Sequence, residues 1–141
     1  MTLKLVVVGV NHKTAPVEIR ERVAVPSDAL EGAVRAVKTR PSIEEAVVLA
    51  TCNRVEVYAT GDDLDAVSRG VRGWLDERGG GAGDYLYEHR GEAAAKHVFR
   101  VCASLDSLVV GDAQILGQAK EAFGAARDAG ATGAVLGKVF P

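Results

Sequence analysis

The sequence has little of what marks membrane, secreted or disulfide-stapled proteins. Its 141 residues include two cysteines, and aromatic residues make up 5% of the chain. No apolar run approaches the roughly 18 residues that cross a bilayer. The first ten residues, MTLKLVVVGV, lack the pattern of a signal peptide and are typical of a strand. We therefore expect a cytoplasmic protein with free thiols, long enough to bury a core without disulfides.

The chain also lacks an excess of charge of one sign and any visible cofactor motif. Its net charge of -2 gives no basic footprint for nucleic acid, so any contact with RNA would be local. The glycine-rich stretch GGGAG at 79–83 neither follows a predicted strand nor opens a helix, so it is no dinucleotide fingerprint. His12, His89 and His97 are scattered, and no structural metal site is expected.

The hydrophobic pattern predicts a single α+β domain over 1–141, a small mainly antiparallel sheet with helices packed on it. The β-branched run at 3–10 favours a central strand covered on both faces. Two runs, AVVLAT and VEVYAT, indicate a hairpin around residues 52–54. Helical stripes are predicted at 29–38, capped by Ser27, at about 63–78, capped by Asp62 or Asp63, and at 91–104 and 113–129.

The hairpin turn Thr51-Cys52-Asn53-Arg54 is the first candidate for chemistry. A thiolate is a strong nucleophile at neutral pH, and a thiol at a strand end can meet solvent. Taken alone, Cys52 is equally well explained as a turn residue. Arg54 suits bidentate capture of a carboxylate, although a lone arginine is more often a surface residue, here paired with Glu56 or solvent.

Other polar residues also have two readings from the pattern alone. His97 borders the apolar stripe of its helix and could transfer a proton, but a half-buried spacer is the commoner role. His12 suggests a turn, His89 a surface loop, and Cys102 core filling in a helix. In the segment SLVVGDAQILGQ, Ser107, Asp112, Gln114 and Gln118 could bind a small polar ligand, or serve as helix caps and a solvated edge.

Four ordered motifs together make the sequence similar to the amino-terminal catalytic domain of the glutamyl-tRNA reductase family. They are GVNHKTAPVEIRERVAV, VVLATCNRVEVYA, KHVFRV and LDSLVVGDAQILGQAKEAF, and they span essentially the whole chain. In that family a cysteine attacks the ester of glutamyl-tRNA to form a thioester, which NADPH reduces to glutamate-1-semialdehyde for tetrapyrrole (porphyrin) biosynthesis.

The resemblance implies a role for each matching residue. Cys52 is the expected nucleophile, and His97 is expected to orient or protonate the reacting ester. The expected glutamyl-binding positions are Thr51, Asn53, Arg54, Ser107, Asp112, Ala113, Gln114 and Gln118. The resemblance further implies that NADPH is bound by a domain that this chain lacks and that no metal is needed. It also implies that the full-length enzyme is a homodimer and that a downstream enzyme uses its product, glutamate-1-semialdehyde. By itself the chain is expected to acylate and deacylate but not to reduce.

Some residues depart from the family pattern. Asp112 and Ala113 stand where Glu and often Pro are usual, and Ser104 replaces a glycine. These changes are the support for a rival hypothesis, a non-catalytic module that binds aminoacyl-tRNA or a regulatory partner. A third hypothesis is a cysteine hydrolase of small esters. The intact set of Cys52, Arg54, His97, Ser107 and Gln114 favours the reductase domain.

Overall fold

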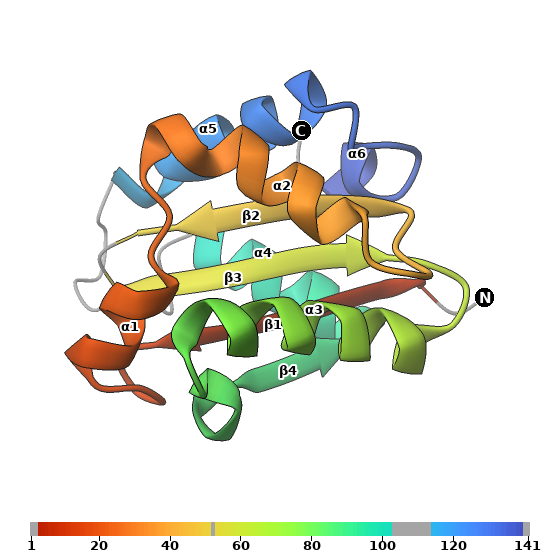
Figure 1. Ribbon diagram of the computed structural model, residues 1–141. Helices are drawn as coiled ribbons and strands as arrows, with labels where there is room; N and C mark the ends of the chain where they lie inside the picture. The colour runs from red at the N-terminus through yellow and green to blue at the C-terminus, as the bar shows by residue number, and fades with distance from the viewer. Residues whose placement is uncertain (1–2, 52, 103–113, 140–141) are drawn as a thin grey trace.

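A four-stranded antiparallel sheet organises the protein in the computed structural model, which describes residues 3–51, 53–102 and 114–139 (Figure 1). The strands are β1 (Leu5–Asn11), β2 (Glu45–Ala50), β3 (Arg54–Thr60) and β4 (Tyr87–Arg90). Their order across the sheet is β2-β3-β1-β4, so β3 and β1 are central. The predicted α+β class is therefore confirmed, as are the central first strand and the hairpin of β2 with β3.

Helices cover both faces of the sheet. Their bounds are α1 (Val17–Val23), α2 (Leu30–Lys38), α3 (Leu64–Gly79), α4 (Glu92–Cys102), α5 (Gln114–Asp128) and α6 (Leu136–Val139). In Figure 1, α3 crosses in front of the sheet while α4 lies behind it. Helix α3 contacts β1 and β3, and α4 contacts β1 and β4. Both α2 and α5 contact the edge strand β2. This covering explains why every residue of β1 is buried.

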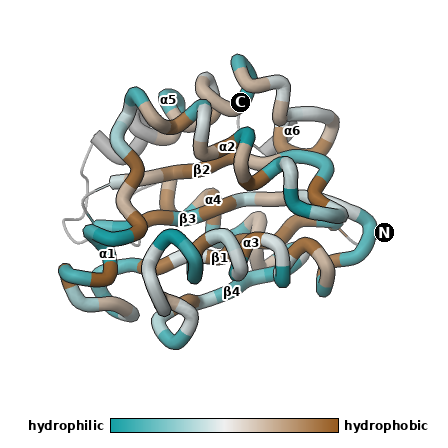
Figure 2. Tube along the Cα trace, viewed as in Figure 1, coloured by the Kyte–Doolittle hydropathy of each residue, from teal (hydrophilic) through white to brown (hydrophobic). Residues whose placement is uncertain are grey.

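Apolar residues concentrate on the strands and on the helix sides that meet them (Figure 2). On α4, for example, Ala94, His97, Val98 and Val101 are buried, the spacing of one helix face. In the described part of the chain, no helix is both long enough and apolar enough to cross a membrane.

Local signals account for several element boundaries. The side chain of Asp63 accepts hydrogen bonds from the backbone N–H groups of Asp65 and Ala66 and so caps α3. Gly80, with φ of 60°, ends the same helix in the left-handed conformation that favours glycine. The helix predicted from Asp63 to about Arg78 is confirmed.

Ser27 is not the helix cap that the sequence predicted. It begins a short 3₁₀ helix, Ser27–Ala29, and α2 follows from Leu30. The backbone N–H of Ala29 donates to the Pro26 carbonyl at 2.9 Å, an i→i+3 bond that tightens this first turn. The segment therefore enters α2 through a 3₁₀ turn instead of a side-chain cap.

His89 is also not in a surface loop. It lies in β4, where it pairs with Val7 of β1 in the antiparallel register. Because β4 is a short edge strand with partly exposed side chains, its sequence YEHR lacks the apolar alternation by which a strand is predicted. Its pairing with β1 places His89 and Tyr87 beside the candidate site described below.

Candidate functional site

Thr51 fixes the turn between β2 and β3 through hydrogen bonds with the backbone of the residues that follow it. The hydroxyl of Thr51 accepts from the backbone N–H groups of Asn53 and Arg54, each at 3.1 Å. The N–H of Thr51 donates to the Arg54 carbonyl at 2.8 Å. Thr51 thus defines the turn through its side chain as well as its backbone. Cys52, the predicted nucleophile between these residues, lies outside the described residues.

Alternation along β3 directs three polar side chains to the face covered by α4. Arg54, Glu56 and Tyr58 are two residues apart, so they share one face of the sheet, while Val55 and Val57 point to the other. All three are almost fully buried, with exposed fractions of 1%, 0% and 1%. The surface reading of Arg54 is therefore wrong, although its predicted partner, Glu56, is correct: Arg54 Nη1 lies 3.6 Å from Glu56 Oε2.

The Glu56 carboxylate is the centre of this buried cluster. Its Oε1 accepts a hydrogen bond from the hydroxyl of Tyr58, and its Oε2 accepts one from the hydroxyl of Tyr87. The same Oε2 is also hydrogen-bonded to Nε2 of His97. Residues of β3, β4 and α4 therefore meet at one buried carboxylate.

The electrostatics of the cluster favour an ionised Glu56. Burial raises the pKa of this carboxyl, but the hydrogen bond and charge of His97, the charge of Arg54 and the hydrogen bond from Tyr58 outweigh it, and the net pKa is lowered. Burial, followed by the charge and hydrogen bond of Glu56, raises the pKa of Tyr58 well above its ordinary value. Tyr58 is thus held as a neutral donor to a charged acceptor.

Packing of α4 brings His97 into the cluster. Its side chain is 5% exposed, on the buried stripe of the helix. The imidazole ring stacks on that of His89, with centroids 4.4 Å apart and planes at 25°, and lies 5.6 Å from the ring of Tyr87. His97 is therefore held by ring contacts as well as by its bond to Glu56.

Cys102 is a poor candidate for a nucleophile. It is half-buried at the end of α4 and packs against the core, as predicted. Burial, with a smaller contribution from the charge of Glu56, raises the pKa of its thiol. A raised pKa leaves less thiolate at neutral pH, so this cysteine is unsuited to attack a carbonyl.

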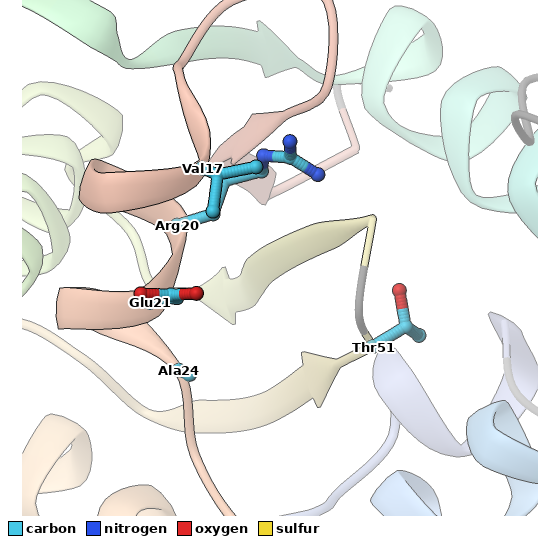
Figure 3. Close-up of a pocket in the computed structure, with 5 residues that line it drawn as sticks. All are labelled: Val17, Arg20, Glu21, Ala24 and Thr51. Carbon is cyan, nitrogen blue, oxygen red and sulfur yellow. The ribbon is translucent and has the colours of Figure 1, made fainter.

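An open pocket of about 200 Å³ lies between α1 and the end of β2. Val17, Arg20 and Glu21 of α1 and Ala24, which follows the helix, line one side and Thr51 lines the other (Figure 3). Glu21, Ala24 and Thr51 also line a wider neighbouring depression that extends to Ser27. Thr51 precedes Cys52, so the pocket borders the turn that carries the predicted nucleophile.

The structure brings together part of the predicted site. Thr51, Asn53 and Arg54 form one turn, and Arg54 meets His97 through Glu56. Ser107, Asp112 and Ala113 lie outside the described residues. Gln114 and Gln118 belong to α5, and their side chains are also outside what the structure describes. The glutamyl-binding roles expected for these five residues therefore stay predictions.

Sequence reasoning missed three members of the cluster: Glu56, Tyr58 and Tyr87. Glu56 and Tyr58 alternate with Val55 and Val57, a pattern typical of a strand with one solvent-facing side, and no element was predicted over Tyr87. The available signal was the three-residue alternation Arg54, Glu56 and Tyr58, because charge and phenol on one strand face suggest a shared polar centre.

The described residues do not form a cradle for a nicotinamide dinucleotide. The glycine-rich stretch follows helix α3, with Gly80 and Gly81 at positive φ, and leads into a 3₁₀ helix, Ala82–Tyr85. A phosphate-binding loop of that class instead joins a strand to the start of a helix. In the same part of the chain, no group of three or more His, Cys, Asp or Glu residues could hold a metal ion.

Known proteins match the chain over nearly its full length. The family model described as "Glutamyl-tRNAGlu reductase, N-terminal domain" matches residues 8–141. Glutamyl-tRNA reductases of Xanthomonas campestris pv. campestris (strain B100) and Stenotrophomonas maltophilia (strain K279a) are each 46% identical over 138 residues, 98% of this chain and 31% of theirs. The structure of glutamyl-tRNA reductase from Methanopyrus kandleri superimposes with a TM-score of 0.79 at 36% identity, covering 98% of this chain and 32% of that one. The chain thus spans about a third of the length of these relatives.

Proposed function

Because the chain belongs to the family of glutamyl-tRNA reductase amino-terminal domains, we propose that it performs the acyl-transfer step of glutamyl-tRNA reduction. The observation that carries the proposal is the buried cluster in which Arg54 and His97 converge on Glu56, directly after the Thr51–Arg54 turn. The cluster supports the proposal because a guanidinium from this turn and an imidazole share one carboxylate.

In the proposed step, the Cys52 thiolate attacks the ester carbonyl carbon of glutamyl-tRNA. A carbon–sulfur bond forms and the bond from that carbon to the ribose oxygen breaks. The ribose oxygen leaves with a proton, and the glutamyl group remains on the enzyme as a thioester. Water can hydrolyse this thioester to release glutamate and restore the thiol.

Arg54 and His97 have distinct proposed roles. His97 takes up the thiol proton or supplies one to the leaving ribose oxygen. Arg54 pairs with the substrate carboxylate, and because its side chain is 1% exposed, the cluster has to open for that contact to form. The pocket between α1 and Thr51 supplies the open side of the turn, where we place the end of the tRNA.

Reduction of the thioester requires a hydride from NADPH. Since the described residues offer no dinucleotide cradle, we assign no hydride step to them. We propose that NADPH and the dimer contacts of the enzyme belong to the part of the relatives that lies beyond the matched third. Incubation of this chain with glutamyl-tRNA and NADPH is then expected to yield no aldehyde.

The direct test is to incubate the chain with tRNA charged with labelled glutamate, in the absence of NADPH. We expect label on the protein that thiols remove, together with loss of charged tRNA. Cys52→Ser should abolish both. Cys102→Ser is the matched control, because this half-buried cysteine lies on α4 and should leave the transfer intact.

The outcome separates the three hypotheses. Intact charged tRNA that binds the native chain without turnover would favour the non-catalytic binding module. Hydrolysis of simple activated esters at the same rate as glutamyl-tRNA would favour the cysteine hydrolase. Transfer that depends on Cys52 and is specific for glutamyl-tRNA supports the acyl-transfer function.

A further inference from the structure

Two carboxylates are buried in the described sheet, and they have different surroundings. Glu45 accepts from the hydroxyl of Thr60 and from the backbone N–H of Leu136, so its partners are structural. Glu56 accepts from Tyr58, Tyr87 and His97 and faces Arg54. Glu56 therefore has partners that the proposed reaction uses, whereas Glu45 does not.

The bond between Glu56 and His97 determines which imidazole nitrogen carries the proton. An ionised carboxylate only accepts hydrogen bonds, so Nε2 of His97 must be the N–H donor. In neutral imidazole the other nitrogen, Nδ1, then has the free lone pair. Within the described part of the chain, the bond to Glu56 is the only hydrogen bond of the His97 ring.

We propose that Glu56 is a positioning residue that holds His97 as the Nε2–H tautomer and so presents Nδ1 to the reacting groups. The proposal rests on the acyl-transfer function proposed above. Nδ1 accepts a proton as the thiol is consumed, and the carboxylate stabilises the imidazolium that forms. The proton then passes from Nδ1 to the leaving ribose oxygen, so none is gained or lost.

The surroundings keep the carboxylate in place for this role. The Tyr58 hydroxyl holds Oε1, while Tyr87 shares Oε2 with His97. Across the sheet, Gly9 pairs with Glu56, and a Cβ at Gly9 would come within 2.9 Å of Glu56 Cγ. The absence of a side chain at position 9 therefore provides the space that Glu56 occupies.

Charged and titratable groups surround the His97 ring and its partner Glu56 from each element packed around them. Glu56 of β3 and Tyr87 and His89 of β4 contact the ring itself. Arg54 and Tyr58 of β3 and Cys102 of the same helix interact with Glu56. Among these, Glu56 is the described carboxylate that contacts His97. Replacing Glu56 thus removes the negative partner and leaves the ring stacking on His89 in place.

Long-range ¹H–¹⁵N NMR of the imidazole nitrogens in this chain tests the arrangement without catalysis. In the native protein, neutral His97 should carry its proton on Nε2. In Glu56→Gln the Nδ1–H tautomer should become populated, because an amide no longer requires a donor. Glu45→Gln is the matched control: it changes a second buried carboxylate and should leave the His97 signals unchanged.

Acylation by labelled glutamyl-tRNA tests the consequence. We expect the rate to fall about tenfold or more in Glu56→Gln, within the range for a disabled acid–base group, and to be unchanged in Glu45→Gln. Should Glu56→Gln not fold, Glu56→Asp keeps the charge but on a shorter arm that withdraws the carboxylate from Nε2, so it should also populate the Nδ1–H tautomer and lower the rate.

The two readouts distinguish the possible failures. Neutral His97 protonated on Nδ1 in the native chain, or tautomers unaltered by both Glu56 variants, would overturn the positioning role. An altered tautomer with an unchanged acylation rate would overturn it as well. If the native chain is not acylated at all, the acyl-transfer function fails, and the NMR result alone decides whether Glu56 positions His97.

Discussion

Gly9 of β1 lies directly opposite Glu56 of β3, and this pairing makes room for the buried carboxylate. A Cβ built on Gly9 would lie 2.4 Å from the Val55 carbonyl oxygen and 2.9 Å from Glu56 Cγ. The nearer of these atoms belongs to the backbone of a central strand and cannot move away easily. A residue that looks like an interruption of an apolar strand is therefore part of how the site is built.

Gly9→Ala should consequently destabilise the protein. Overpacking of this kind costs about 1–3 kcal/mol, which urea denaturation would measure as a lower midpoint. Gly32→Ala is the matched control, because a Cβ at Gly32 in α2 meets nothing within 4 Å and should stabilise the helix slightly. Equal midpoints for Gly9→Ala and the native chain would show that the sheet relaxes around the added methyl group.

Tyr58 should make the native state sensitive to alkaline pH. Its pKa in the folded chain is raised well above the ordinary 10.0 by burial and by the charge of Glu56, so unfolding releases a proton at high pH. The contribution of Tyr58 to stability is fully present below pH 10.0 and is lost as the pH rises above that value.

Urea denaturation across a pH series, followed by tyrosinate absorbance, would measure this loss. Tyr58→Phe should be less stable at neutral pH by about 1 kcal/mol, because Glu56 loses a donor. That difference should shrink above pH 10.0. A native chain and a Tyr58→Phe variant that lose stability in parallel would contradict the assignment.

The parts of the fold that depend on local sequence were predictable. The β-branched run of β1 and the alternation of β3 identify two strands, and Asp63 with Gly80 marks the two ends of α3. By contrast, β4 is short and its residues do not alternate between apolar and polar, so its conformation depends on pairing with β1. The 3₁₀ turn at Ser27 likewise depends on how the chain leaves Pro26.

The turn and His97 of the candidate site were predictable from the sequence, but the buried carboxylate that joins Arg54 to His97 was not. The tetrapeptide from Thr51 to Arg54 identifies itself through a cysteine and an arginine at a strand end. Glu56 could not be recognised, because an acidic residue alternating with Val55 and Val57 is typical of a solvent-facing strand side. Its burial comes from the packing of α4, which local sequence does not encode.

Glu45 should anchor the C-terminal segment to the edge of the sheet. Its Oε2 accepts from the Thr60 hydroxyl at 2.7 Å and its Oε1 from the Leu136 N–H at 3.1 Å. Beside it, the Ala46 N–H donates to the Ala131 carbonyl at 3.0 Å, so the segment covers a strand edge. Glu45→Ala leaves two buried donors without an acceptor.

We expect Glu45→Ala to cost about 1–3 kcal/mol and to speed hydrogen exchange of the Leu136 amide. Glu44→Ala is the matched control, since Glu44 is the exposed neighbour and its side chain should matter little. Faster exchange in both variants, or in neither, would argue against Glu45 as the anchor.

The pocket beside Thr51 should control access of tRNA to the turn. Ala24, directly after α1, is exposed and lines the pocket, so Ala24→Leu would fill part of the pocket volume of about 200 Å³. Since the residues around Glu56 are untouched, the buried cluster should remain intact. A bulky leaving group such as a tRNA end would then be hindered, while a small glutamyl ester would still reach the turn.

The measurement is the rate of Cys52-dependent acylation with each of the two substrates. We expect Ala24→Leu to lower the rate with glutamyl-tRNA by about tenfold, equivalent to about 1.4 kcal/mol of binding or barrier, and to leave the rate with glutamyl methyl ester unchanged. Ala36→Leu, at an exposed alanine of α2 away from the pocket, should alter neither rate. Equal loss with both substrates would instead mean that Ala24→Leu disturbs the turn itself, and the tRNA end would then have to approach Cys52 from another side.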